Sequence, residues 1–212
     1  MKVINARFEI LTPISNCGIE ELQHIEKIGR VCYKSENKIT DDGESAKKFV
    51  KMLIDRGHTA MIEHSSLSVK FIVDRGVSHE LVRHRIASFA QESTRYCNYS
   101  KDKFDNGVTF IKPFFFDDVK YQRWLSAMAD AESAYLDLLN GGASPQEARS
   151  VLPNSTKTEI TITANYRVWR NFFKLRTTKA AHPQMREVAV PLLAELKEKL
   201  PIIFDDIEVE EE

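Results

Sequence analysis

Three arginines and a histidine lie within one short segment of the chain. The segment begins with Arg83-His84-Arg85 and continues through Ser93 to Arg95. The whole chain has a formal net charge of −1 at pH 7, so this positive charge is local. Arginine donates two parallel hydrogen bonds to phosphate oxygens and does not lose its charge. The segment therefore predicts a pocket for a small, multiply anionic ligand such as a nucleotide phosphate.

A second group of cationic and amide side chains comes later in the sequence. Arg149 stands alone, and Asn165 lies where a strand pattern gives way to a helical one, a place where ligands collect in α/β proteins. Arg167 and Asn171 are one helical turn apart and share a helix face. Arg176 follows an apolar helical run, where it either extends to solvent or contacts an anion.

Other chemistries fit these residues less well. Ser93 has no neighbouring base to make it a nucleophile, so a phosphate-binding or capping hydroxyl is favoured. Cys97 lies near arginines, which lower a thiol pKa, yet isolated cysteines are more often small buried apolar residues. The spacing of His58, His64, His79 and His84 fits no standard zinc pattern, so we expect no metal site. The chain contains neither a GxGxxG nor a P-loop sequence.

The apolar pattern predicts strands alternating with helices. Period-two alternation indicates strands over residues 2–11, 66–73, 108–111 and 157–164, and helical spacing indicates helices over 19–33, 45–56, 168–175 and 183–200. A further long helix contains Trp124 and ends at Gly141-Gly142. The pattern predicts an α/β (α+β) fold with a central sheet flanked by helices, in a single domain over residues 1–212.

Two helix starts have recognisable caps. Ser144, Pro145 and Glu147 match an N-cap, a proline in the first turn and a carboxylate three residues after the cap. Ser78 is expected to cap a helix that presents Glu80, Arg83 and His84 on one face, because these residues stand at i, i+3 and i+4.

The composition excludes several classes of protein. The three cysteines form no CxxC pair, and the N-terminal residues carry charge too early for a signal peptide, so a cytoplasmic setting is expected. No uncharged apolar run reaches the roughly 18 residues of a membrane span. A nucleic-acid-binding module remains an alternative, although the sequence pI of about 6.6 and the confined basic segment favour a small ligand.

The Arg83-His84-Arg85-x7-Ser93 motif, together with other segments in the same order, resembles the flavin-dependent thymidylate synthases. The resemblance covers most of the chain, and the further matching segments are Gly57-His58 to Glu63-His64, Arg149-x2-Leu152-Pro153, Asn165-x-Arg167-x3-Asn171, Leu175-Arg176 and Ala181-His182-Pro183-Gln184. It implies methylation of dUMP to dTMP, with methylenetetrahydrofolate as carbon donor and with FAD, reduced by NADPH, as hydride source. It also implies a homotetramer whose active sites are shared between subunits.

The resemblance assigns a role to each matching residue. Catalytic roles go to Arg176, at the uracil N3, and to His58, beside the flavin and substrate. The dUMP-binding residues would be Glu80, Arg83, Gln91, Ser93, Arg95, Arg149 and Arg176. The FAD-binding residues would be Ala60, Arg83, His84, Arg85, Gln91, Asn165, Arg167 and Asn171.

This sequence departs from the family pattern at two of these positions. Glu80 stands where a glutamine is expected, and Ala60 stands where a small hydroxyl residue is usual, so only a backbone contact to FAD carries over there. A cysteine-dependent pyrimidine methyltransferase that uses Cys97 is the second alternative.

Overall fold

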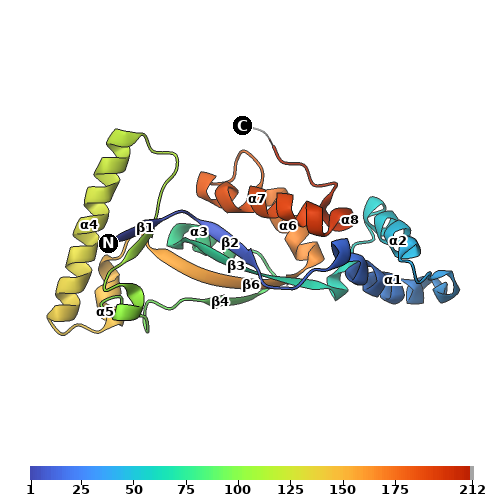
Figure 1. The fold of residues 1–212 in the computed structure, drawn as a ribbon, viewed down its shortest axis with the longest axis horizontal. Coiled ribbons are helices and arrows are strands. Elements are labelled where there is room, and N and C mark those ends of the chain that lie inside the picture. Colours follow the sequence, from blue (N-terminus) through green and yellow to red (C-terminus); the bar gives the residue numbers. More distant parts are fainter. Residues whose placement is uncertain (211–212) are drawn as a thin grey trace. The chain divides into compact units, whose positions relative to one another are not determined.

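The computed structural model describes residues 1–210, except for the side chain of Asn16. Strands and helices are interspersed along this part of the chain (Figure 1). Its internal contacts define two compact units. Unit 1 comprises Met1–Phe8, Lys70–Arg83 and Phe89–Thr161, and unit 2 comprises Glu9–Val69, His84–Ser88 and the chain from Ile162 onward. The mixed α/β class is confirmed. A single domain over residues 1–212 stays a prediction, and its last two residues lie outside the described part.

The strands form two sheets where one was expected. The first pairs β1 (Lys2–Ile4) with β5 (Thr109–Ile111) in parallel, with Val3 opposite Phe110. The second has the order β2-β3-β6-β4, and its strands are β2 (Arg7–Ile10), β3 (Ser66–Asp74), β6 (Lys157–Asn165) and β4 (Ser88–Gln91). The boundary between the units falls within all four of these strands.

The strand β6 follows the predicted alternation throughout, and β3 follows it as far as Phe71, after which Ile72 and Val73 are both buried. In β3, Leu67, Val69 and Phe71 are fully buried, and in β6 the same holds for Thr158 and Ile160. Successive side chains of a strand point to opposite faces, so every second residue reaches the core. The strands predicted over 66–73 and 157–164 are confirmed, each one residue longer.

The prediction of one continuous strand over residues 2–11 is wrong. The segment is divided into β1 and β2, which belong to different sheets, and Asn5 and Ala6 lie between them. Asparagine and alanine are both depleted in strands, which is consistent with a break at this point.

Unit 2 contains two groups of helices. The helix α1 (Ile19–Tyr33) packs against α2 (Glu44–Asp55), while α6 (Tyr166–Arg176) packs against α7 (Pro183–Lys199), which also contacts α8 (Pro201–Phe204) (Figure 1). The fully buried Glu26 of α1 is paired with Arg30 at 2.6 Å and accepts a hydrogen bond from Ser45 of α2 at 2.7 Å. Val31 and Cys32, near the end of α1, are exposed.

Unit 1 contains α3 (Arg75–Leu81), α4 (Asp118–Asn140) and α5 (Pro145–Ala148). A core cluster joins α4 to the rest of the unit through Tyr99, Phe110, Trp124, Met128 and Tyr135. The predicted capping box at the start of α5 is present, and α4 ends at Gly141 as expected. In the described part of the chain the short 3-10 turns are η1 (Asn16–Gly18), η2 (Glu36–Lys38), η3 (Met61–His64), η4 (Asp102–Phe104) and η5 (Arg149–Val151).

Candidate functional site

The predicted site residues divide between the two units. Unit 1 carries Glu80, Arg83, Gln91, Ser93, Arg95 and Arg149, which are all the residues expected to bind the nucleotide except Arg176. Unit 2 carries His58, Ala60, His84, Arg85, Asn165, Arg167, Asn171 and Arg176, which include all the residues expected to bind only the flavin. The boundary therefore separates the two expected ligand groups almost completely, and it passes between Arg83 and His84.

The Arg83-His84-Arg85 segment lies in a turn. The helix α3 starts at Arg75, three residues before the expected cap Ser78, because the carboxylate of Asp74 accepts the backbone N–H of Val77 at 2.7 Å. It ends at Leu81, before the triplet. The prediction that Ser78 caps this helix is wrong, and so is the single helix face for Glu80, Arg83 and His84.

Burial alternates along this turn. The side chains of Arg83 and Arg85 are exposed, while His84 between them is only 7% exposed. The strand β4 then begins at Ser88, and no pattern in the sequence pointed to it. The turn leaves two guanidinium groups at the surface and directs the imidazole inward.

Hydrogen bonds fix the polar residues that follow the turn. The amide nitrogen of Gln91 donates to the hydroxyls of Ser78 at 2.9 Å and Thr158 at 3.3 Å. The Ser93 hydroxyl accepts the backbone N–H of Arg95 at 3.3 Å. The Ser93 hydroxyl is thus bound by the local backbone, while its predicted phosphate contact stays a prediction.

A cavity of about 410 Å³ in unit 1 contains Arg149. Its lining consists of Arg75, Thr94, Gln146, Arg149, Ser150 and Leu152. One terminal nitrogen of Arg149 donates to the Thr94 hydroxyl at 3.3 Å. Thr94 lies between Ser93 and Arg95 in the chain, so the cavity brings the end of the first predicted segment to the start of the second.

Arg75 is a candidate that the sequence reasoning missed. Its backbone N–H donates to the carbonyls of Asn154 and Thr156, which fixes its position at the end of β3. Its Nη1 is buried and has no hydrogen-bond partner among residues 1–210. A buried donor without an acceptor costs about 1–3 kcal/mol. An arginine directly after a buried strand was the available signal.

Cys97 lies in a setting that suppresses thiolate chemistry. Burial, and then the nearby Glu92 carboxylate, raises the pKa of its thiol above the usual value. Glu92 is held by Lys157 at 2.8 Å and by the hydroxyl of Tyr99 at 2.9 Å. The negative charge beside Cys97 is therefore fixed in place, which opposes the alternative of a cysteine nucleophile.

His84 and Arg176 meet within unit 2. The Nε of Arg176 donates to Nε2 of His84 at 2.9 Å, and the His84 ring packs edge-on against Phe172 at 4.9 Å between centroids. Burial, and then the Arg176 charge, lowers the pKa of His84 to about 4. The imidazole is therefore neutral at physiological pH.

The other unit 2 residues lie around the start of α6 and along η3. The side chain of Asn165 caps α6 by accepting the Val168 N–H at 2.9 Å, which confirms its predicted place at the junction of strand and helix. Arg167 forms an ion pair with Glu63 at 2.5 Å. Ala60 and Asn171 are exposed.

His58 lies on an exposed turn after α2. Its Nδ1 is 3.1 Å from the hydroxyl of Tyr33, at the end of α1, and its backbone N–H donates to the carbonyl of Leu53. These two contacts hold the ring beside α1, within the same unit as Arg176.

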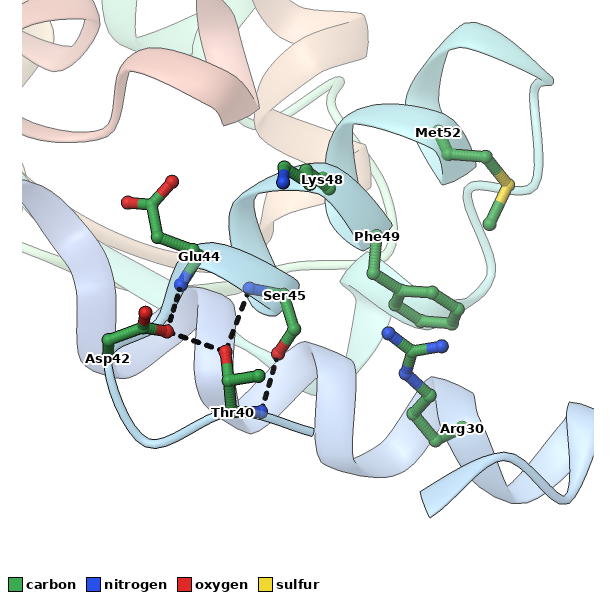
Figure 2. Close-up of a pocket in the computed structure, with 8 residues that line it drawn as sticks. All are labelled: Arg30, Thr40, Asp42, Glu44, Ser45, Lys48, Phe49 and Met52. Carbon is green, nitrogen blue, oxygen red and sulfur yellow. Dashed lines mark hydrogen bonds between the residues drawn. The ribbon is translucent and has the colours of Figure 1, made fainter. Parts of the chain in front are cut away.

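A larger cavity in unit 2, about 530 Å³, includes none of the predicted residues (Figure 2). Thr40, Asp42 and Ser45 hydrogen-bond one another there and close the turn that leads into α2. The Arg30 guanidinium lies 4.4 Å from the ring centre of Phe49 and is already bound to Glu26. The polar groups of this cavity thus stabilise the packing of α1 on α2.

The described residues contain neither a metal-binding cluster nor a membrane-spanning helix. Within residues 1–210, there is no group of three or more His, Cys, Asp or Glu side chains that could bind a metal ion. The same part of the chain has no helix with the length and apolar character needed to cross a membrane.

Comparisons with known proteins give a consistent result. The family model described as thymidylate synthase complementing protein matches residues 19–202. A flavin-dependent thymidylate synthase of Mycobacterium avium (strain 104) is 34% identical over 87% of this chain and 79% of its own length. The Corynebacterium glutamicum protein of the same name is 32% identical, over 91% of this chain and 81% of its own length.

A solved structure shares the fold. The UMP/dUMP methylase PolB from Streptomyces cacaoi, bound with 5-Br dUMP, superposes with a TM-score of 0.76 and 23% identity, over 97% of this chain and 96% of that one. The family model covers most of the sequence, and the curated relatives are matched over more than two thirds of their length. The chain therefore belongs to the flavin-dependent thymidylate synthase family.

Proposed function

We propose that this protein catalyses the reductive methylation of dUMP to dTMP, with 5,10-methylenetetrahydrofolate as carbon donor and NADPH-reduced FAD as hydride source. Family membership and the shared name of the relatives support a thymidylate synthase that depends on a flavin. The observation that carries the proposal is the cavity of unit 1, because two arginines line it and the predicted nucleotide-binding residues lie next to it in the chain. The protein is then a methyltransferase of dTMP biosynthesis.

The phosphate of dUMP binds in this proposal at the cavity of unit 1. Arg149 and Arg75 line it, and Ser93 and Arg95 flank the lining residue Thr94. A phosphate oxygen would supply the acceptor that Nη1 of Arg75 lacks among the described residues. Bonds from guanidinium groups to phosphate are charge-assisted and about twice as strong as neutral ones.

The remaining nucleotide residues of unit 1 are Glu80, Arg83 and Gln91. Gln91 is held in one orientation by its bonds to two hydroxyls, so it offers a fixed amide to the base. Glu80 is half-buried in the last turn of α3 and Arg83 is exposed just after it. A carboxylate is unfavourable next to phosphate, so Glu80 is assigned to the base or sugar end of the nucleotide.

Arg176 is the proposed activating residue. A guanidinium beside N3 of uracil stabilises the anionic form of the base, which makes the ring a better nucleophile. By analogy with oxyanion donors, removing one such group costs about 10²–10³ in rate. Because the positive charge of Arg176 is permanent, it meets this requirement at every pH of interest.

The donor set of unit 2 fits an anionic dinucleotide. Arg85 and Arg167 supply positive charge for the pyrophosphate of FAD, and Asn171 supplies an exposed amide. Ala60, His84 and Asn165 complete the unit 2 set, and the resemblance assigns Arg83 and Gln91 to both ligands. When bound, the flavin supplies the hydride, while the protein provides orientation and charge.

Two of the assigned residues, His58 and Arg167, have protein partners in the structure. Arg167 would exchange its ion pair with Glu63 for a ligand phosphate, which its exposure permits. His58, held by Tyr33, is proposed to lie beside the flavin and the substrate and to restrict the access of water.

The proposal includes a cytoplasmic homotetramer with active sites shared between subunits. The division of the predicted residues into two groups is compatible with ligands bound by more than one subunit. The near-neutral net charge favours a small-molecule substrate over nucleic acid.

The proposal can be tested on the purified protein. We expect a visible flavin spectrum and release of FAD by acid. Arg176→Ala should reduce dTMP formation by about 10²-fold or more while FAD stays bound. Arg123→Ala, an exposed arginine of α4, is the matched control and should change neither. A colourless protein that does not take up FAD would refute the proposal.

A further inference from the structure

The contact between His84 and Arg176 joins two segments that are 92 residues apart in the chain. His84 belongs to the turn after α3, and Arg176 is the last residue of α6. Both belong to unit 2, and the contact is a direct hydrogen bond of 2.9 Å from Nε of Arg176 to Nε2 of His84. It connects the basic triplet Arg83-His84-Arg85 to the residue proposed to activate the uracil ring.

The direction of this bond fixes the protonation of His84. Arginine only donates hydrogen bonds, so Nε2 of His84 must carry a lone pair. The ring proton is then on Nδ1, and the imidazole is neutral. A doubly protonated ring would have no acceptor and would repel the guanidinium.

Packing holds both partners of the contact. The His84 ring lies against Phe172, one turn before Arg176 on the same helix. The helix itself is anchored by Trp169, whose indole donates to the carbonyl of Leu67 at 3.0 Å, and by Arg170, which binds Asp206 at 2.6 Å. The backbone of α6 is therefore fixed.

Arg176 still has a long side chain with several rotatable bonds. A bond at Nε sets the plane of the guanidinium group, and with it the direction of the two terminal nitrogens. A fixed planar donor loses less conformational entropy on binding its target than a mobile one.

We propose that His84 is a positioning residue for Arg176, which it orients toward the uracil ring through the unprotonated Nε2 of a neutral Nδ1–H imidazole. The role in catalysis rests on the proposed function, whereas the protonation state of His84 does not. His84 does not exchange a proton with substrate here; it acts through Arg176.

The protonation state can be measured directly by long-range ¹H–¹⁵N correlation spectra of the flavin-bound protein labelled with ¹⁵N-histidine. His84 is the only buried histidine among the six, all of which lie in the described part of the chain, and His84→Gln identifies its signal. We expect the Nδ1–H tautomer with unprotonated Nε2, unchanged as the pH falls to about 5.5, below the ordinary histidine pKa of about 6.5. A proton on Nε2, or titration of His84 above about pH 6, would overturn the inference.

Two substitutions test the positioning role in the same holoenzyme. His84→Phe keeps an aromatic ring against Phe172 but removes the acceptor, and we expect kcat/KM for dUMP to fall by about 10-fold or more. His84→Gln retains an acceptor oxygen and should recover part of this loss. His79→Gln, at an exposed histidine of α3, is the control.

The pattern of results separates the inference from the proposed function. Equal losses in His84→Phe and His84→Gln, or none in either, would refute positioning by an acceptor. A wild-type protein that forms no dTMP would refute the proposed function, and the imidazole spectrum would still decide whether Nε2 of His84 is unprotonated, as its bond with Arg176 requires.

Discussion

The buried, neutral His84 predicts a specific loss of stability in mild acid. In the folded protein the pKa of His84 is about 4, because the ring is buried and lies beside Arg176. In the unfolded chain a histidine has a pKa of about 6.5. Between these two values the unfolded chain binds the proton more tightly, so the free energy of unfolding decreases as the pH falls through this window.

The size of the effect follows from the two pKa values. At about pH 5 the unfolded histidine is almost fully protonated and the folded one almost fully neutral. Linkage then gives a loss of about 2 kcal/mol relative to about pH 7.5. This is a large share of the 5–15 kcal/mol that is typical of globular proteins.

Urea unfolding at several pH values, at one protein concentration, measures this contribution. His84→Gln removes the titrating group, so the stability difference between wild type and variant should change by about 2 kcal/mol between about pH 7.5 and pH 5. The exposed His24 supplies the control, since His24→Gln should follow the wild-type curve. A difference between wild type and His84→Gln that stays constant across this range would refute the reasoning.

Three further predictions concern the nucleotide site and the assembly. Arg75→Gln should weaken dUMP binding by about 10-fold and leave deoxyuridine binding unchanged, because the lost bond is to phosphate; titration calorimetry with both ligands checks this, and equal losses would contradict it. Cys97→Ser should retain dTMP formation, since burial and Glu92 raise the pKa of the thiol and keep it protonated; abolished turnover would support the cysteine-dependent alternative. Sedimentation should give a particle about four times the 24.3 kDa chain mass, and a monomer would contradict shared active sites.

Local sequence patterns were enough to predict the elements whose structure depends on neighbouring residues alone. The alternation in β6 and in the first part of β3 reflects one buried face, and the box at Ser144 and Glu147 satisfies its own backbone groups, so both are readable without the fold. Asn165 was likewise placed correctly, because a cap must stand where a strand passes into a helix.

The basic triplet shows where local reasoning fails. The spacing of Glu80, Arg83 and His84 suits a helix, but the helix starts earlier, at the Asp74 cap, and ends at Leu81 before the triplet. Which of two nearby polar residues caps a helix depends on the backbone that enters it, and a spacing rule does not contain that information.

Contacts between residues far apart in the chain could also not be predicted from the sequence. The bond between His84 and Arg176 spans 92 residues, and the cavity that joins Arg75 to Arg149 depends on how β3 ends beside the segment before β6. The resemblance to the family supplied site residues in both units. Arg75 belonged to none of the matching segments, and the structure identified it through the cavity that it lines and through its buried nitrogen, which has no partner among the described residues.

The central claim is tested most directly by assaying dTMP formation with each component left out in turn. The purified protein with dUMP, methylenetetrahydrofolate, NADPH and FAD should form dTMP, and omission of NADPH or removal of the flavin should abolish it. Product formation that persists without flavin and NADPH, or no product in the complete mixture with FAD bound, would contradict the account.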